Sequence, residues 1–469
     1  MTTVTRPLFT ASTRGSAKLL SKPISVFIVF GFIYLLTWAG HYTSGDGAQK
    51  VAWAKAMLFR HTANLSTTGG IQFSKYSVGH SLIAMPGFAI AASIATLSHV
   101  KCEAAFYTLL FIVNGAFFVY LAWTYLMRRY SIAQAWGTVV LIGLCSTWWP
   151  YTKLDFSEPL VLTILFAGFL LATRGNPVLG VVVASLAITV RPDSVVQALI
   201  LCLWLAWRSG SWRLLVFTGP AIFPALLINA FCNYVRWGSF HEMGYAGETF
   251  STPLLVGLYG ILFSAGKSIF LFSPPLILGV LGISRFIRKP EGRQEAAFFV
   301  AVFLSELLLY SKWWDWSGDD AWGVRFLVPG VMLICLFAVE MLKFRFLVAA
   351  VAFTGFFVQT LGVLINGLDY ELVVRSQTLQ RVALYQQPPT RNRVDFEDVR
   401  FNPRYSQLAA HWLLIRWALG FPPLVQREAA NASGTSLYDA LLDTGYKQKP
   451  TLDLLWFRLS ADEGKAPDR

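Results

Sequence analysis

The chain has 469 residues, of which 55% are hydrophobic and 14% charged, and its formal net charge is +13. A mean hydropathy of +0.52 excludes an ordinary soluble domain, because apolar runs long enough to cross a hydrocarbon core recur along the chain. The fold class is therefore an all-α polytopic membrane protein, since each helix satisfies its own backbone hydrogen bonds. In such a protein the excess of Lys and Arg sets topology and attracts anionic lipid, so membrane lipids, and no nucleic acid, are expected partners.

The N-terminal segment, residues 1–22, is basic and precedes an apolar run over residues 23–40. The positive-inside rule makes this segment cytoplasmic, and we interpret the run as an uncleaved anchor because no convincing cleavage site precedes it. The chain then emerges on the outer side. There Asp46 stands at the start of a predicted surface helix that ends at Arg60.

The next apolar segment, residues 76–98, is long enough to cross but is interrupted by glycine, proline and His80. We place it in the outer interface, because every later loop then obeys the charge rule. About eleven transmembrane helices are predicted in all. The ten that follow the first span cover residues 104–126, 132–150, 159–173, 178–190, 194–207, 214–234, 271–285, 296–310, 326–342 and 346–365.

The outer segments are long, whereas the inner connections are short and basic. The predicted division is a cytoplasmic N-terminus (1–22), a transmembrane domain (23–365) that includes the outer loop 41–101, and a C-terminal extracytoplasmic region (366–469). In the last region apolar side chains recur at helical spacing and predict a surface helix. These side chains are Leu408, Trp412, Ile415 and Leu419.

Ionisable residues gather in the outer segments and are rare in the spans. Because ionisable groups at membrane depth are costly, a cluster at one face indicates a site there. A transport pathway would more often place charge near the midplane. The cluster consists of Asp46, Lys75, His80, Lys153, Asp155, Glu158, Arg191, Asp193, Lys267, Lys312, Asp315, Asp319, Asp320 and Arg325.

Several of these residues also have a local interpretation. Ser44 or Asp46 would cap the surface helix. The helix dipole would favour the negative charge of Glu158 at the start of a span. Arg191, at a helix break, would pair with the acidic residue two positions later. Lys312 and Arg325 would be interface anchors whose charged ends reach the headgroups.

Several short motifs lie in a characteristic order along residues 23–365. They are Asp46 in the first outer loop, Lys-Tyr-x-x-Gly-His (75–80), Phe-Ser-Glu-Pro-Leu (156–160), Thr-Val-Arg-Pro (189–192), Phe-Ser-Pro-Pro-Leu (272–276), and Lys-Trp-Trp (312–314) leading to Trp-Gly-Val-Arg-Phe (322–326). This order resembles the GT-C superfamily of polyprenyl-phosphate-sugar glycosyltransferases. The closest pattern is the protein mannosyltransferase-like branch, which includes the aminoarabinose transferases. The family's first loop often carries two adjacent acidic residues, whereas Asp46 has glycine on both sides.

The resemblance implies an enzyme of the bacterial inner (plasma) membrane with its active site on the periplasmic side. It would move a sugar from a polyprenyl-phosphate-sugar donor to an extracytoplasmic glycan, lipid or protein acceptor, with inversion. Asp46 would be the general base for the acceptor hydroxyl. The substrate-binding residues would be Lys75, Tyr76, His80, Lys153, Glu158, Arg191, Lys267, Lys312 and Arg325.

The sequence predicts no certain cofactor. His80 has no second His or Cys at ligand spacing, so a metal site around it is not predicted. A divalent cation held by Asp46 with Glu158 or Asp319 stays open. Two other functional classes also stay open: a lipid-linked sugar flippase or another polytopic transporter, and a non-catalytic assembly subunit.

Overall fold

The computed structural model describes residues 22–245, 247–319, 321–367, 370, 400–403, 406–421 and 450–456, and no strand occurs among them. The prediction of an all-α polytopic architecture is confirmed. Five segments of this part of the chain are long and apolar enough to cross a membrane. They are α4 (Val78–Ser98), α5 (Glu103–Leu126), the run Leu214–Trp237 made of α11, η2 and α12, α16 (Gly292–Lys312) and α18 (Arg345–Leu364).

Shorter apolar helices fill the spaces between the long ones. They are α2 (Pro23–Leu36), α6 (Ile132–Cys145), α8 (Glu158–Thr173), α9 (Pro177–Val190), α13 (Leu254–Phe263) and α15 (Pro275–Phe286). The predicted number of crossings stays a prediction. The helix α13 lies between the predicted spans 214–234 and 271–285, where no span was predicted. Its ten residues are too few to cross a membrane.

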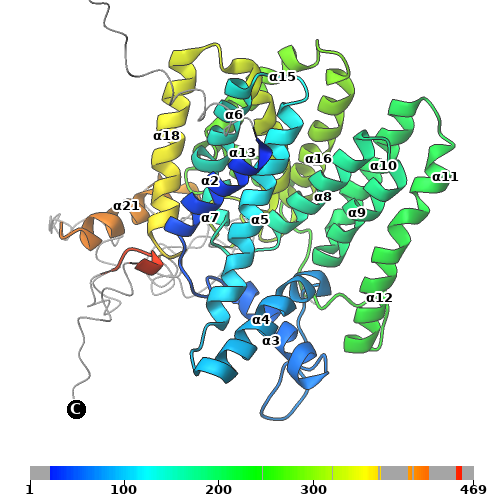
Figure 1. The fold of residues 1–469 in the computed structure, drawn as a ribbon, viewed down its shortest axis with the longest axis vertical. Coiled ribbons are helices and arrows are strands. Elements are labelled where there is room, and N and C mark those ends of the chain that lie inside the picture. Colours follow the sequence, from blue (N-terminus) through cyan, green and yellow to red (C-terminus); the bar gives the residue numbers. More distant parts are fainter. Residues whose placement is uncertain are drawn as a thin grey trace, which may run out of the picture.

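The remaining described elements include α10, which coincides with the predicted span 194–207, and several shorter or peripheral helices. They are α3 (Gly45–Arg60), α7 (Trp148–Tyr151), η1 (Pro192–Ser194), α10 (Val195–Ser209), α14 (Ile269–Phe272), η3 (Arg325–Leu327), α17 (Val328–Cys335), η4 (Leu336–Met341) and α21 (Gln407–Ala418). The predicted surface helix after Asp46 corresponds to α3, and the predicted helix of the C-terminal region corresponds to α21. Figure 1 shows α3 and α4 together at one end of the bundle, where α4 also packs against α5.

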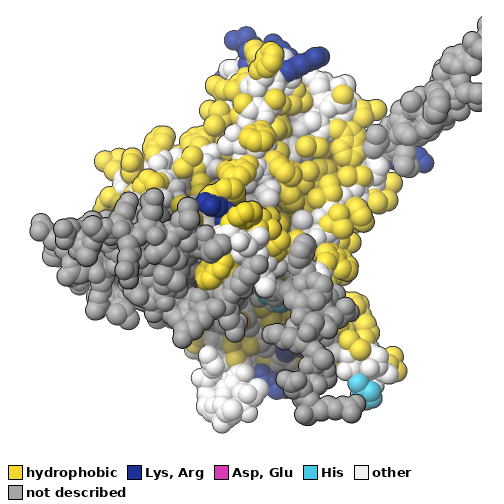
Figure 2. Space-filling view, turned by 90° about the vertical axis from the view of Figure 1, so that its left-hand side faces the viewer, with side chains coloured by type: hydrophobic (Ala, Val, Ile, Leu, Met, Phe, Trp, Pro, Cys, Tyr) yellow, Lys and Arg dark blue, Asp and Glu magenta, His cyan; other side chains and the backbone are white. Residues whose placement is uncertain are grey.

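The two ends of the bundle differ in their charged residues. At one end Lys55 of α3 pairs with Glu103, the first residue of α5. Just beyond the other end of α5, Arg129 pairs with Glu295 at 2.5 Å and with Glu291 at 3.1 Å. The predicted inner loops therefore meet at one end, opposite to Asp46. Figure 2 shows Lys and Arg side chains at the upper end of the molecule, above a broad apolar band.

The packing of α8 on α9 brings two predicted site residues together. A Cβ atom on Gly168 would lie 2.5 Å from the carbonyl oxygen of Gly180, so the two helices approach at a distance that only glycine permits. The helices run antiparallel as a hairpin. Because α8 begins at Glu158 and α9 is followed directly by Arg191, the hairpin places these two side chains side by side.

Candidate active site

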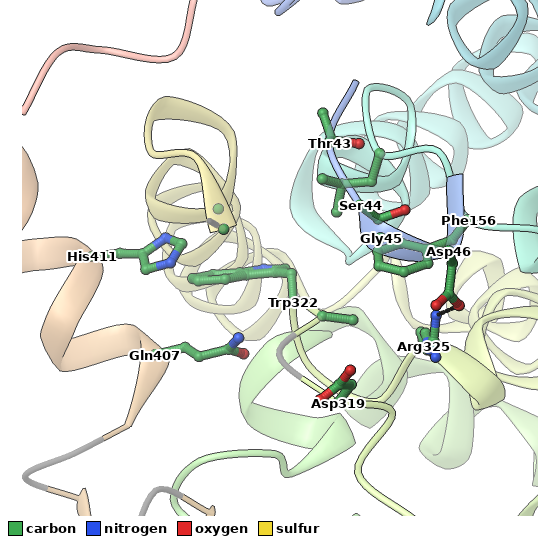
Figure 3. A pocket seen from close by; sticks show the side chains of 14 residues that line it. Thr43, Ser44, Gly45, Asp46, Phe156, Asp319, Trp322, Arg325, Gln407 and His411 are labelled. Carbon is green, nitrogen blue, oxygen red and sulfur yellow. Dashed lines mark hydrogen bonds and ion pairs between the residues drawn. The ribbon is translucent and has the colours of Figure 1, made fainter. Parts of the chain in front are cut away.

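Asp46 and Arg325 form an ion pair at the end of the bundle that carries α3. The Asp46 carboxylate accepts a hydrogen bond from Nη1 of Arg325 at 2.5 Å and, on its other oxygen, one from the hydroxyl of Tyr76 at 2.5 Å. Figure 3 shows Asp46 and Arg325 pointing toward each other. The side chains are 22% and 11% exposed, so the pair is largely shielded from water. Residues 279 positions apart in the sequence thus meet in one contact.

The start of α3 is capped by Ser44, not by Asp46. The Ser44 hydroxyl oxygen accepts a hydrogen bond from the backbone N–H of Gly47 at 2.9 Å. The same hydroxyl, together with that of Thr43, donates to the buried carboxylate of Asp155. Because Ser44 satisfies the helix terminus, the Asp46 carboxylate is available for Arg325 and Tyr76. The predicted helix cap is therefore confirmed for Ser44 and wrong for Asp46.

Gly47 is required at this helix start because Asp155 packs directly against it. A Cβ atom at Gly47 would lie 1.8 Å from Oδ2 of Asp155. We expect Gly47→Ala to displace Asp155 and to lower the free energy of unfolding by about 1–3 kcal/mol, the usual cost of overpacking. Thermal unfolding of the purified protein measures this effect. Gly45→Ala is the matched control, since a Cβ there meets nothing within 4 Å; equal stability of the two variants would contradict the expectation.

Arg191 forms a second cationic centre beside the first. Its guanidinium donates to Glu158 at 2.5 Å, to Asp193 at 3.2 Å and to the hydroxyl of Tyr310 at 2.5 Å. The guanidinium also lies 5.2 Å from the ring centroid of Phe326, which follows Arg325 in sequence. The predicted local pair of Arg191 with Asp193 is thus present, as part of a larger network that reaches the Asp46 pair.

A cavity of about 360 Å³ opens between these two centres. The cationic side chains of Lys75, Arg191 and Arg325 line it, together with Asp46 and Tyr76. Lys75 pairs with Glu248 at 2.6 Å. The remaining wall contains the aromatic side chains of Tyr245, Phe250, Trp313 and Trp314. Carboxylates also line it, namely those of Asp46, Asp193, Glu248, Asp315 and Asp319, and each of the three cations is paired with one of them. We call this hollow the cationic cavity after its three cations, which lie beside broad apolar surfaces.

Lys50 is a site residue that the sequence analysis missed. It lies one helical turn after Asp46 in α3 and is only 2% exposed, with its ammonium 4.8 Å from the ring centroid of Tyr76. Within the described part of the chain no carboxylate lies within ion-pair distance of Lys50. Burial lowers the pKa of Lys50, and the nearby charges of Asp46 and Glu158 oppose that shift. The i, i+4 spacing to Asp46 was the signal that could have identified it.

The electrostatic surroundings keep Asp46 ionised. Burial alone would raise the pKa of its carboxyl, but the charges of Arg325 and Lys50 and the hydrogen bond from Tyr76 outweigh burial. The pKa therefore lies well below its usual range. At neutral pH the site holds a carboxylate whose negative charge is already compensated by protein cations.

Two predicted phosphate ligands, Lys153 and Lys267, bind backbone carbonyl groups and do not line the cationic cavity. The Lys153 ammonium is buried and donates to backbone carbonyl oxygens of Val363 and Asp453, while pairing with the Asp453 carboxylate at 2.8 Å. Lys267 donates to three carbonyl oxygens of the loop 319–323. Both lysines bind backbone, so they hold loops of the outer end in place and do not line the cationic cavity.

His80 and Lys312 also lie apart from the cationic cavity. His80 is fully buried, and its ring nitrogens contact the hydroxyls of Ser157 at 3.1 Å and Tyr107 at 3.0 Å. Lys312 ends α16 and does not line the cationic cavity. The structure thus brings together Asp46, Lys75, Tyr76, Glu158, Arg191 and Arg325.

The carboxylates of the site do not fit the divalent cation that the sequence left open. Both Asp46 oxygens are engaged by Arg325 and Tyr76, and one Glu158 oxygen is engaged by Arg191. Among the described residues no group of three or more His, Cys, Asp or Glu side chains could hold a metal ion. Arg325 on Asp46 and Arg191 on Glu158 take positions that a cation shared by these carboxylates would need.

Comparison with known proteins gives two similar solved structures. No family model matches the chain, and no curated protein does. The structure of ArnT from Cupriavidus metallidurans in the apo state is 14% identical, with a TM-score of 0.45, covering 71% of this chain and 60% of that one. The structure of ArnT from the same organism bound to undecaprenyl phosphate is 14% identical, with a TM-score of 0.43, covering 78% and 65%. The chain thus spans less than two thirds of the proteins it matches.

Proposed function

We propose that the chain is an integral membrane glycosyltransferase of the GT-C superfamily. It moves a sugar from a polyprenyl-phosphate donor to an extracytoplasmic acceptor. The observation that carries the proposal is the convergence of the Asp46 carboxylate with Arg325, Arg191 and Lys75 on one cavity. The order of motifs along residues 23–365 supports the same family. The membrane side follows from the positive-inside rule, which makes the Asp46 end periplasmic.

The cationic cavity suits the phosphate of the donor. Arg325 and Arg191 offer planar guanidinium groups that grip phosphate with two hydrogen bonds, and Lys75 adds a point charge. When the sugar leaves, the phosphate gains negative charge, and fixed cations in a shielded site stabilise that charge. The aromatic wall at Trp313 offers an apolar surface for the sugar or for the first part of the lipid.

The acceptor reacts through a hydroxyl group. Its oxygen attacks the anomeric carbon from the face opposite to the phosphate, and the carbon–oxygen bond to phosphate breaks, which inverts the configuration. The hydroxyl proton passes to Asp46, and the products are the glycosylated acceptor and polyprenyl phosphate. Such a base contributes roughly 10²–10⁴-fold to the rate.

Donor binding would activate Asp46 through Arg325. In the structure Arg325 lowers the pKa of the Asp46 carboxyl, which makes it a weak base. A donor phosphate competes with Asp46 for the same guanidinium. As the phosphate takes the charge of Arg325, the proton affinity of Asp46 rises, so the base becomes effective only when donor is present.

Transfer by the purified full-length chain in detergent tests the proposal. The assay uses undecaprenyl phosphate carrying a radiolabelled hexose, pentose or aminopentose, with an envelope lipid and glycan extract as acceptor. We expect label to move to the extract without a sealed compartment. Translocation of donor in vesicles with no transfer in detergent would instead establish the flippase alternative. Intact donor binding in Arg191→Ala and Arg325→Ala would favour the assembly-subunit alternative.

Transfer is expected to continue when divalent cations are removed. Arg325 and Arg191 already engage the Asp46 and Glu158 carboxylates that a metal ion would need, so the donor phosphate is expected to be held by protein cations. The measurement compares the initial rate in about 5 mM EDTA, an excess over trace metal, with the rate in about 5 mM Mg²⁺. The two rates are expected to differ less than about twofold. A rate that falls more than about tenfold in EDTA and returns with Mg²⁺ would contradict it.

A further inference from the structure

A second cavity adjoins the Asp46–Arg325 pair, with a volume of about 270 Å³. It shares Asp46, Asp319 and Arg325 with the cationic cavity, but Lys75 and Arg191 do not line it. Figure 3 shows Asp46 and Arg325 at one end of this hollow and His411 and Gln407 of α21 at the other. We call it the tail cavity, because α21 of the C-terminal region supplies part of its wall.

His411 has one buried ring nitrogen for which the described part of the chain offers no hydrogen-bond partner. Its Nδ1 lies 3.0 Å from the carbonyl oxygen of Leu361, and a carbonyl can only accept, so Nδ1 carries the proton. Nε2 then carries no proton and offers its lone pair as a hydrogen-bond acceptor. This atom has no hydrogen-bond partner within the described part of the chain, although the residue is only 2% exposed. A buried acceptor of this kind is costly unless a ligand or water satisfies it.

The imidazole stays neutral at physiological pH. Burial, with a smaller contribution from the nearby ammonium groups of Lys267 and Lys153, lowers the pKa of His411 to about 4. The hydrogen bond to Leu361 acts in the opposite direction and is outweighed. Nε2 is therefore offered as a neutral acceptor, which is the partner that a hydroxyl donor requires.

The tail helix is fixed against the catalytic loop. The Gln407 side-chain oxygen accepts a hydrogen bond from the backbone N–H of Gly323 at 3.3 Å, two residues before Arg325. The His411 ring packs on Trp322 with 4.7 Å between ring centroids. These contacts hold α21 in register with the loop that carries Arg325, so the wall of the tail cavity is preorganised.

We propose that the tail cavity receives the acceptor and that it recognises an uncharged, polyhydroxylated group whose hydroxyl donates to Nε2 of His411. This inference rests on the proposed function. A phosphate in the tail cavity would meet one guanidinium, that of Arg325, beside the carboxylates of Asp46 and Asp319. The neighbouring cavity offers two further cations, Lys75 and Arg191, although each is paired with a carboxylate. At His411 an ammonium group would exchange its hydration for one neutral acceptor, which is unfavourable, because the Asp46 carboxylate lies at the opposite end of the cavity and is paired with Arg325. The aromatic faces of Phe156 and Trp322 suit the apolar face of a sugar ring.

Transfer kinetics test the assignment through matched variants. His411→Phe keeps an aromatic ring beside Trp322 but removes Nε2, whereas His411→Gln restores an acceptor oxygen. We expect His411→Phe to raise the KM for the acceptor about three- to tenfold with an unchanged donor KM, and His411→Gln to recover most of the loss. Trp412→Phe, at the next and exposed position of α21, is the control and should match the wild type. An unchanged acceptor KM in His411→Phe, or a raised donor KM, would overturn the assignment.

Binding without transfer separates this inference from the proposed function. The probe is methyl β-D-glucopyranoside, added to full-length protein labelled with ¹⁵N-histidine, and the signal lost in His411→Gln identifies the ring. Saturation with the glucoside should shift the His411 Nε2 resonance, and inorganic phosphate or methylamine should not. A shift with phosphate or methylamine but none with the glucoside, or no shift with any probe, overturns the inference even if transfer is observed. If the wild type transfers no sugar, the proposed function fails while this arm still decides the ligand class.

Discussion

Replacing Asp46 with asparagine is expected to lower the rate of sugar transfer at least a hundredfold. The asparagine side chain keeps the shape of the carboxylate and can still accept a hydrogen bond from Arg325, but it cannot take the acceptor proton. A positioned general base contributes about 10²–10⁴-fold, so its removal sets the size of the loss. The measurement is kcat in the detergent assay with saturating donor and acceptor.

The control for Asp46→Asn removes a carboxylate at the same end of the bundle. Glu103 pairs with Lys55 of α3, and both side chains are at least one third exposed. An exposed pair of this kind contributes little to stability, so Glu103→Gln should retain transfer within about twofold. Near-normal kcat in Asp46→Asn, with normal thermal unfolding, would remove Asp46 as the base.

The stability that the Asp46–Arg325 pair contributes should decrease as the pH is lowered into the acidic range. The folded-state pKa of Asp46 lies below its ordinary value of about 3.9, so the unfolded chain takes up the proton first as the pH falls. The pair's contribution is therefore complete above pH about 5 and declines as the pH drops through the folded-state pKa. The difference in unfolding temperature between wild type and Asp46→Asn should be constant from pH about 5 to 8 and shrink below about 4. A difference that peaks at neutral pH would contradict this.

The helices and the division of charge between two ends could be predicted because both follow from composition along the chain. Apolar length fixes the helices, and short basic loops fix which ends share a side. The contact between Asp46 and Arg325 needed the motif order in addition, since the two residues lie 279 positions apart. The closeness of Glu158 and Arg191 follows from the α8–α9 hairpin, which the spans themselves imply.

The groups that each individual lysine contacts could not be predicted from the sequence. Lys75 lines the cationic cavity, whereas Lys153 and Lys267 donate to backbone carbonyl oxygens of distant loops. An ammonium group suits either partner equally, and the choice depends on where loops such as 319–323 lie in space. The same reason applies to Lys50, whose ammonium lies over the ring of Tyr76 in the structure.

Arg325→Lys is expected to raise the KM for the donor about 10–100-fold while retaining the positive charge. The guanidinium of Arg325 lies between the rings of Phe156 and Phe326, at 4.7 and 4.9 Å from their centroids. Its Nε is buried and has no hydrogen-bond partner among the residues that the structure describes. This N–H can therefore bind a phosphate oxygen before Nη1 releases Asp46. Lysine has neither the planar fork nor the stacking surface, and it loses charge-assisted hydrogen bonds worth about 1.5–3 kcal/mol each.

The measurement for Arg325→Lys is the donor KM in the transfer assay, together with direct binding of undecaprenyl phosphate to the purified protein. Arg60→Lys is the matched control, because Arg60 ends the same helix α3 and bonds only to exposed backbone carbonyls of residues 64–66. Its donor KM should stay within about twofold of the wild type. If Arg325→Lys bound donor normally and lost only kcat, the phosphate would lie elsewhere, and the activation of Asp46 by competition for this guanidinium would be disproved.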